Sequence, residues 1–409
     1  MIPPERYATP SLVRPFLHAL DRLQQREMLR PVQLTERAVS LLAEYFGAKT
    51  VPVEAAFAHG SLALIGDHTH HVGGFALMRS VAHGMAVAVR GTEEAGVRVA
   101  LEGEGAWAFG PDRASGSPAG APRLARAVGT LLRCLAPPGY GVEAVVVGTV
   151  PQAVAEARLG ASGVAAARAL QALLARADDT TTLIRAVRTT LSEVMEQPFS
   201  AAYLLASDAG RAEAFILVDT HTLESLPVMT AGQEKPGWGL VAMPEPPPDA
   251  AEHDRHRVEK AGAALELLRR KGFATLASFR ELEHRDLQRA LDVLPRRYRP
   301  VVRYLVTANR LVPKLVGAVR RGDWQMFGAL LLMSHAAQRN DWGNVTPEAD
   351  FVVEQVRAMS LEGLYGAHIT GRGGGVLLVG QPFALPAALD RIQAAFEDRF
   401  GLLPETLLL

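Results

Sequence analysis

Two strand-like runs on either side of a histidine-rich turn constrain this chain more than any other feature. The runs "VPVEAAFAHGSLALIG" (51–66) and "FALMRSVAHGMAVAVR" (75–90) alternate or stay apolar over short stretches, as strands do. Between them, "GDHTHHVGG" places one acidic residue and three histidines next to glycines. We therefore expect a strand that leads into a ligand-binding turn.

The rest of the chain mixes strand and helix patterns without an internal repeat. Further strands are expected within 96–109, 141–150, 212–228 and 366–382. Helical spacing predicts two helices over 11–46 that break near Pro31, and then helices over 123–135, 157–177, 253–271, 278–293, 296–320, 323–337, 347–358 and 385–399. Residues 115–122 are expected to form a loop, and the proline-rich 243–254 a domain junction or exposed loop. This order indicates an α+β protein.

Composition and charge narrow the classes of function. A chain of 409 residues has room for two or three domains and a cleft. Its 43 basic residues balance 43 acidic ones, which leaves no net field to favour nucleic acid or an anionic membrane. The single cysteine, Cys134, fits a reducing compartment. Because the first ten residues also lack the apolar core of a signal peptide, we expect a cytoplasmic protein.

Several segments resemble one family, and they occur in that family's order. "LIGDHTHHVGGFAL" (64–77) is similar to the sugar-binding signature of galactokinases, which are members of the GHMP small-molecule kinases. "GVEAVVVGTVP" (141–151) stands where that family has the strand entering its phosphate loop, and residues 194–228 follow its catalytic segment. Residues 319–341 and "YGAHITGRGGGVLLVG" (365–380) resemble its C-terminal helix and its glycine motif.

This resemblance implies both a fold and a reaction. It extends over about residues 40–409 and implies a helical extension (1–35), an N-terminal domain (36–228) and a C-terminal domain (229–409). Each domain would pack helices on a mixed sheet, with a ligand cleft between the two domains. The family reaction uses ATP and Mg²⁺ to phosphorylate a sugar to a sugar 1-phosphate. Such a transfer needs positioned phosphate donors, a cation near the developing charge and a group near the attacking oxygen.

The segment at the place of the phosphate loop departs from the family pattern. Family members have glycines there, because glycine lets backbone N–H groups approach the phosphates. This chain reads "PQAVAEARLGASGVAAA" (151–167), with Ala153 and Ala155 in place of glycines. Glu156 adds a negative charge near the expected polyphosphate. The sequence therefore predicts weakened ATP binding.

Two other groups of residues offer replacement phosphate contacts. Gly160, Ser162 and Gly163 are expected to form a shifted turn with Arg158 as a phosphate contact, unless this segment is an ordinary helix start. The motif "GAHITGRGGG" (366–375) also implies phosphate contacts, and it contains Gly371, Gly373 and Gly374. Its glycines alternatively serve only a tight connection between strands.

The positions implied for catalysis are changed as well. Ser61 aligns with the family's arginine, so the cation expected near the transferred group is missing. Arg372, within the glycine motif, is a candidate replacement. Glu196 aligns with the catalytic aspartate and either orients a sugar hydroxyl or lies solvated on the surface.

The predicted sugar contacts are similarly altered. Asp67 and His70 stand at the places of the family's Glu and Asp, and His68 matches the family's histidine. His253 aligns with a tyrosine that helps to hold the sugar. Galactose would lose several hydrogen-bond partners, so it is a poor candidate substrate.

Three functions remain open from the sequence. The first is a galactokinase-like protein that has lost most of its phosphorylating activity and acts in sugar binding, in regulation or as a scaffold for a protein partner. The second is an active kinase on a different sugar or polyol that uses Arg158, Glu196 and Arg372. The third is a zinc site in which His68, His70 and His71 are joined by Asp67 or His59.

Overall fold

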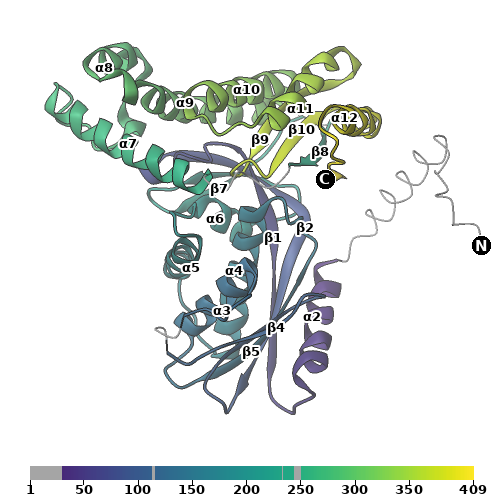
Figure 1. Ribbon diagram of the computed structural model, residues 1–409. Helices are drawn as coiled ribbons and strands as arrows, with labels where there is room; N and C mark the ends of the chain where they lie inside the picture. The colour runs from purple at the N-terminus through teal and green to yellow at the C-terminus, as the bar shows by residue number, and fades with distance from the viewer. Residues whose placement is uncertain (1–29, 113–115, 233, 244–249) are drawn as a thin grey trace, which may run out of the picture.

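The computed structural model describes residues 30–112, 116–232, 234–243 and 250–409, and it contains two β-sheets (Figure 1). The larger sheet has seven strands, in the order β4-β3-β5-β2-β6-β7, with β1 paired to β2. Its strands are β1 (Val53–Ile65), β2 (Phe75–Thr92), β3 (Gly96–Leu101), β4 (Gly105–Phe109), β5 (Gly141–Gly148), β6 (Phe215–Asp219) and β7 (Glu224–Val228). The strand patterns between residues 51 and 228 are thereby confirmed.

The long strand β2 organises this sheet. It pairs antiparallel with β1 over most of its length, with β6 through Phe75–Arg79 and with β5 through Met85–Thr92. The pairing of β3 with β5 is parallel, whereas the other pairings in the sheet are antiparallel. The histidine-rich turn therefore closes the β1–β2 hairpin, next to the point where β6 joins β2.

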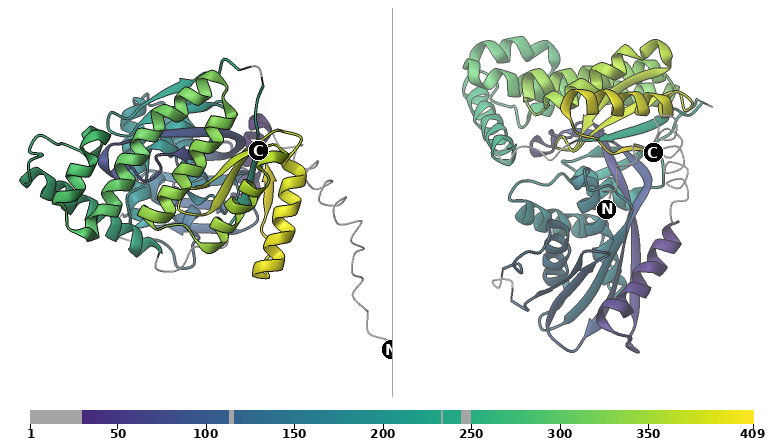
Figure 2. Two further views of the ribbon diagram at one scale, coloured as in Figure 1. Left: turned by 90° about the horizontal axis from the view of Figure 1, so that it is seen from above. Right: turned by 45° about the vertical axis from the view of Figure 1, so that its right-hand side comes forward.

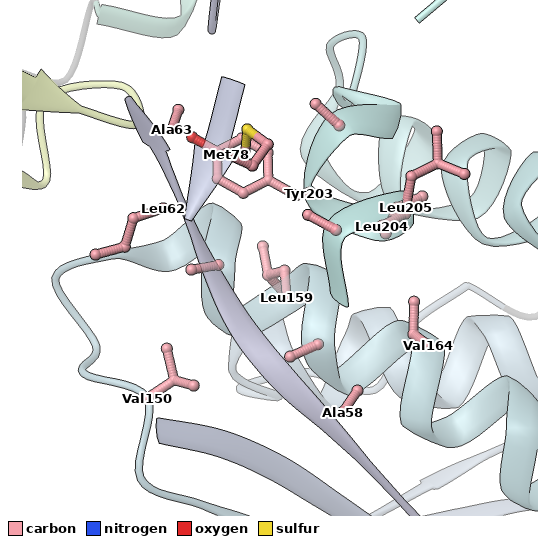
Figure 3. Close-up of a cluster of buried hydrophobic side chains, with 14 of the residues drawn as sticks. Ala58, Leu62, Ala63, Met78, Val150, Leu159, Val164, Tyr203, Leu204 and Leu205 are labelled. Carbon is pink, nitrogen blue, oxygen red and sulfur yellow. The ribbon is translucent and has the colours of Figure 1, made fainter. Parts of the chain in front are cut away.

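Helices cover both faces of the larger sheet. One face carries α3 (Arg123–Leu135), α4 (Ala155–Leu173), α5 (Thr180–Met195) and α6 (Ala201–Ala209), and the other carries α2 (Pro31–Phe46). Successive side chains of β2 point to opposite faces of the sheet. Val87 and Val89 therefore pack in the core under α3, α4, α5 and α6, called here the first core, while Ala86 and Ala88 pack under α2. Figure 3 shows side chains of β1, α4 and α6 meeting in the first core.

The second sheet is antiparallel and has the order β11-β8-β10-β9. Its strands are β8 (Gly237–Ala242), β9 (Leu364–Thr370), β10 (Gly375–Gly380) and β11 (Thr406–Leu408). The expected strand–turn–strand over 366–382 is confirmed as β9 and β10. The strands β8 and β11 are additional elements that the sequence pattern did not predict.

The C-terminal half also contributes helices, some packed on this second sheet and others packed on one another. They are α7 (Ala250–Arg270), α8 (Leu287–Val293), α9 (Arg299–Arg321), α10 (Trp324–Ala337), α11 (Pro347–Ala358) and α12 (Leu385–Phe400). Seen from above, α7 and α8 lie at one edge of the molecule and α12 lies at the opposite edge (Figure 2). One apolar core includes Leu204 of α6 and Phe327 of α10, so it continues from one sheet to the other. None of the helices in the described ranges has the length and apolar character needed to cross a membrane.

Two local expectations need correction, and two helices were missed. The helix expected over 278–293 forms only as α8, because 279–281 and 284–286 make short 3₁₀ turns. The Ser278 hydroxyl accepts a hydrogen bond from the backbone amide of Arg280. This local bond competes with the hydrogen bonds that would continue a helix. Residues 250–254 begin α7 rather than a loop, since the prolines end before this point. The helices α5 and α6 were not predicted.

The α+β class is confirmed, and α2 confirms the second helix expected within 11–46. The helix expected before Pro31 lies outside the described residues. The chain leaves the larger sheet after β7 and enters the second sheet at β8. The domain limits at residues 35 and 228 stay predictions.

Candidate functional site

The turn between β1 and β2 is rigidly held by its own backbone. Gly66 has a φ of +82°, and a Cβ there would lie 2.2 Å from the carbonyl oxygen of Phe75. The buried Thr69 hydroxyl donates to the carbonyls of Gly66 at 2.9 Å and Phe75 at 3.1 Å. This geometry requires glycine at position 66 and directs Asp67 and His68 into the protein.

Asp67 is a buried carboxyl with an aromatic alcohol as its direct partner. Asp67 is 6% exposed. The hydroxyl of Tyr203, on α6, lies 3.0 Å from each of its two carboxyl oxygens. Burial and the nearby Glu156 raise the pKa of Asp67 to about 7, against the opposing effects of Tyr203 and Arg372. Asp67 therefore changes charge near neutral pH.

Arg372 lies between the two sheets and contacts acidic groups from two helices. Its Nε lies 3.6 Å from Oε1 of Glu156 and 3.9 Å from Oδ2 of Asp254. Its Nη2 donates to the carbonyl of Pro198 at 3.0 Å. Glu156, which is buried, belongs to the first turn of α4. Arg372 thus links the turn between β9 and β10 to α4, to α7 and to the segment after α5.

The glycine motif packs directly against the start of α4. Gly371 has a φ of +63°, and a Cβ there would lie 2.8 Å from Oε2 of Glu156. A Cβ on Gly374 would lie 1.7 Å from the carbonyl oxygen of Ala153, a distance that excludes any larger residue. Gly373 has a φ of +99°. This turn therefore covers the segment that aligns with the family's phosphate loop.

The expectation of a shifted turn near residue 160 is wrong, because Gly160, Ser162 and Gly163 lie inside α4. A Cβ on Gly160 would be 3.1 Å from Cβ of Tyr203, and one on Gly163 would be 2.8 Å from Cγ1 of Val187. These glycines allow α6 and α5 to pack closely on α4. The alternative of an ordinary helix start is what the structure has.

Arg158 also lies on α4 and pairs with Glu104 between β3 and β4, at 3.6 Å. Burial lowers its pKa, while the attraction of Glu104 raises it. Arg158 thus pairs with Glu104, whereas Glu156 pairs with Arg372. A phosphate contact through Arg158 stays a prediction.

The two other predicted catalytic residues differ in burial. Ser61 on β1 is fully buried, and its hydroxyl donates to the carbonyl of Tyr203 at 3.1 Å. Glu196 is exposed at the C-terminal end of α5, with a φ of +53°. His253 is exposed on α7, next to Asp254. Their catalytic and sugar-binding roles stay predictions.

A buried polar chain extends from His68 into the second sheet. Asn344 lies 3.0 Å from Nε2 of His68 and donates to Gln338 at 2.8 Å, and Gln338 lies 3.1 Å from His368. Burial lowers the pKa of His68 to about 3, so its imidazole is neutral at physiological pH. The segment Gln338–Trp342 is a π-helix, a form that often occurs at functional sites.

The histidines of the turn are engaged with neighbouring groups. His70 Nδ1 lies 2.9 Å from the carbonyl of Asp67, and Trp342 stacks on both His68 and His71, with ring centroids 5.2 and 5.7 Å away. Burial lowers the pKa of His70 to about 4. Among the described residues, no group of three or more His, Cys, Asp or Glu side chains is arranged to hold a metal ion. The zinc alternative therefore has no support in this part of the chain.

The cavity at this place is small, about 20 Å³. It is lined by His68, His70, His71, Gln197, Pro198, Asp254, Arg255, Val258, Trp342 and Arg372. That space holds about one water molecule. The structure thus brings the predicted residues His68, His70 and Arg372 together in the lining of this small cavity, with Asp67 beside them. Sequence reasoning missed Tyr203, Trp342 and Asn344, because nothing in the local pattern marks aromatic or amide residues that meet only in the fold.

Comparison with solved structures defines the class of fold. The chain superposes on Lactococcus lactis galactokinase complexed with galactose with a TM-score of 0.80 and 20% identity, over 92% of this chain and 96% of that one. Mevalonate kinase of L. major, in complex with R-mevalonate, matches with a TM-score of 0.58 and 16% identity, over 88% and 97% of the two chains. The fold is that of the GHMP kinases.

Sequence comparison finds relatives among the galactokinases. Residues 41–91 match the galactokinase galactose-binding signature. The galactokinase of Thermotoga neapolitana is 30% identical over 214 residues, or 51% of this chain and 55% of that protein. Human galactokinase is 34% identical over 118 residues, 28% of this chain and 30% of that protein. The chain spans about half the length, or less, of these curated relatives. These matches support the resemblance of this chain to the galactokinases among the GHMP kinases.

Proposed function

We propose that this chain binds a sugar or a related small molecule, and that ATP-dependent phosphorylation by the family route is lost or strongly reduced. The observation that supports this most directly is the position of Glu156. Its buried carboxylate lies in the first turn of α4 and pairs with Arg372 at 3.6 Å. The protein thus places its own negative charge where its family resemblance implies the phosphates of ATP.

Electrostatics explains why this matters. A helix N-terminus attracts one anion through its free N–H groups and its dipole. A buried carboxylate at that place repels a triphosphate, and the repulsion is strong because the surroundings screen it poorly. Gly374 also lies against the carbonyl of Ala153, which closes the approach from the second sheet. We infer that the residues present do not fit the phosphates of ATP.

The predicted catalytic positions support the same proposal. Removing one preorganised group that stabilises the transition state costs about 100- to 1,000-fold in rate. Ser61 carries no charge and is hydrogen bonded to the carbonyl of Tyr203, and Glu196 is exposed at the C-terminal end of α5. A sugar or polyol remains the ligand class that the family suggests, with Asp67, His68, His70 and His253 as the predicted contacts.

One observation favours the second candidate, an active kinase with a rebuilt site. Asp67 has a pKa raised to about 7, mainly by burial and then by Glu156. A carboxyl that titrates near the working pH is well suited to accept a proton from a hydroxyl group. In that case Asp67 would replace Glu196 as the base, and Arg372 would supply the cation.

Ligand-dependent unfolding separates the two candidates. We expect the melting temperature to rise with a neutral sugar and not with Mg-ATP, because a ligand stabilises only the state that binds it. We also expect no sugar-dependent ATP turnover for the wild-type protein. Sugar phosphorylation that disappears in both Asp67→Asn and Arg372→Met would instead establish the rebuilt kinase. Stabilisation by neither class of ligand would contradict both.

A further inference from the structure

One segment of the chain departs sharply from the overall balance of charge. The whole chain has a formal net charge of zero, yet the segment between Asp292 and Asp323 contains eight basic residues and no acidic one. Most of this segment is the helix α9. A local excess of one sign of charge attracts a partner of the opposite sign, even where the net charge of the protein is zero.

Four of these cations form a single row on α9. Arg303, Arg310, Lys314 and Arg321 are all exposed, and they follow the spacing i, i+7, i+11 and i+18, which brings them to one side of a helix. The row is about 27 Å long at 1.5 Å per residue. Arg321 lies along this face over Gly317, where a Cβ would come within 3.3 Å of its Nη1. The row therefore has the length of a partner helix of about 18 residues.

Most of this row is not neutralised by the protein itself. Arg303 pairs with Asp341 at 2.6 Å. Arg310, Lys314 and Arg321 take part in no ion pair within the described ranges. Their charges are therefore free to pair with carboxylates of another molecule.

The neighbouring helix α10 adds an exposed apolar row. The two helices pack side by side (Figure 1), and α10 contains no Asp, Glu, Lys or Arg. Met326, Ala329 and Met333 follow the spacing i, i+3 and i+7 on its exposed face, and the two methionines are 47% and 54% exposed. Methionine side chains are flexible and adapt to the shape of a bound helix. A basic row thus lies on the helix next to an apolar row.

The surroundings favour a single acidic helix over a larger polyanion. The helix α11 packs on the same strand, β9, as α10 does, and it carries Glu348, Asp350 and Glu354. These carboxylates would repel a nucleic acid or an anionic membrane that extended beyond α10. Single-stranded nucleic acids also stack their bases on aromatic side chains, and neither row contains one. One helix can contact both rows without reaching α11.

From these observations we propose that α9 and α10 form a docking surface for an acidic amphipathic helix of a protein partner. Carboxylates of the partner pair with Arg310, Lys314 and Arg321, and its apolar side chains lie on Met326 and Met333. The surface contains none of the residues assigned to the sugar, so the proposed function does not depend on it.

The test uses the full chain and fluorescence anisotropy with a labelled peptide of about 18 residues, the length of the row. The peptide carries glutamates along one row of a helix and leucines along the adjacent row. A control peptide has the same composition in scrambled order. We expect the amphipathic peptide to bind about tenfold more tightly than the scrambled one, because only the first presents both rows together.

Charge reversal on α9 tests the basic row. Arg310→Glu combined with Lys314→Glu should raise the Kd for the amphipathic peptide about tenfold or more, because attractive pairs become repulsive. The control combines Arg123→Glu on α3 with Arg185→Glu on α5, which makes the same change in charge at exposed positions of the larger sheet's helices. Salt screens distant charges, so this control should leave the Kd within about twofold of the wild-type value.

Polar substitution on α10 tests the apolar row. Met326→Gln combined with Met333→Gln should raise the Kd about fivefold, because apolar contact is lost. The affected residues are exposed, so the melting temperature should stay close to that of the wild-type protein in every variant.

The other outcomes would overturn the proposal. Equal binding of the two peptides, or an unchanged Kd after charge reversal on α9, would show that these rows are not a docking surface. An oligouridylate RNA or phosphatidylserine vesicles that bind more tightly than the peptide, and lose binding in the α9 variant, would overturn the protein partner. The absence of binding by the amphipathic peptide would also overturn it. Sugar binding, measured separately on the same variants, should be unchanged.

Discussion

Two buried carboxylates of this protein behave in opposite ways. Glu143 on β5 is fully buried and accepts hydrogen bonds from Arg90 at 2.6 Å, from Lys49 at 3.0 Å and from Arg98. Burial opposes its ionisation, but these cations outweigh burial and lower its pKa. Asp67 is similarly buried, yet burial and the nearby Glu156 raise its pKa to about 7, because the hydrogen bond from the uncharged Tyr203 and the more distant charge of Arg372 offset them only in part.

The difference shows that the charge of the partners, not burial alone, decides the state of a carboxyl group. Glu143 is part of an ion cluster beneath the end of α2, where Arg90 also donates to the carbonyl of Phe46. Its role is structural. Asp67 lies in a centre whose charges are less well compensated, and such groups are concentrated at functional sites. The following predictions test this contrast.

The largest effect is expected for Glu143→Ala. The substitution leaves the guanidinium of Arg90, which is 2% exposed, without its carboxylate. Breaking a buried ion pair from one side costs about 3–5 kcal/mol in the free energy of unfolding. Urea denaturation followed by circular dichroism measures it. Glu259→Ala, at an exposed glutamate of α7, is the control and should change stability by less than about 0.5 kcal/mol. Equal losses for the two variants would contradict the ion cluster.

Asp67→Asn should have an effect that depends on pH. Because the pKa of Asp67 is raised in the folded protein, its contribution to stability is complete below its ordinary value of 3.8 and is lost as the pH rises through about 7. Asparagine does not titrate. The stability of the variant relative to wild type should therefore improve by on the order of 3 kcal/mol between pH 5 and pH 8.

Glu143→Gln provides the matched comparison for this pH dependence. The lowered pKa keeps Glu143 ionised at both pH values, so the loss of stability should be the same at pH 5 and pH 8. Denaturation curves of both variants at the two pH values measure the difference. A constant effect of Asp67→Asn across this range would show that the Asp67 carboxyl has an ordinary pKa.

Arg372→Met should have a smaller effect. Arg372 lowers the pKa of Asp67 by charge, so its removal should move the pH midpoint of the Asp67 effect upward. The ion pairs at 3.6 and 3.9 Å are partly exposed, and their loss should cost no more than about 1 kcal/mol. The variant Arg372→Lys retains the charge and should restore the midpoint. A downward shift in Arg372→Met would contradict the arrangement.

The smallest effect is expected for His68 and His70, which should not titrate near neutral pH. Burial lowers the pKa of His68 to about 3 and that of His70 to about 4. Their imidazole signals in nuclear magnetic resonance spectra should therefore not shift between pH 5.5 and pH 8. His68→Gln and His70→Gln would assign the two signals. A midpoint near pH 6.5 for either residue would mean that the centre is open to water.

Much of the fold was predictable, because local patterns reflect local structure. Alternating apolar residues identified β1 and β2, and helical spacing identified α3 over its full length. The order of motifs indicated the resemblance to galactokinases, which the comparisons support. The expectation over 278–293 was wrong because side-chain bonds near Ser278 form short turns where the apolar spacing alone indicates a helix.

The candidate site was predictable only in part. The chain itself marks Asp67, His68 and Arg372 by their place in recognisable motifs, and it marks Glu156 as an unusual charge near the phosphate loop. These are properties of residue type and order, which are present before the chain folds.

Contacts between distant residues required the folded chain. Tyr203 meets Asp67 across 136 positions, and Asn344 meets His68 across 276. The glycines at 160 and 163 suggested a turn in the sequence, yet they serve helix packing, because α5 and α6 lie close to α4 only after folding. The raised pKa of Asp67 has the same origin: residue type supplies the carboxyl group, but the packing of both sheets removes it from water and chooses its neighbours.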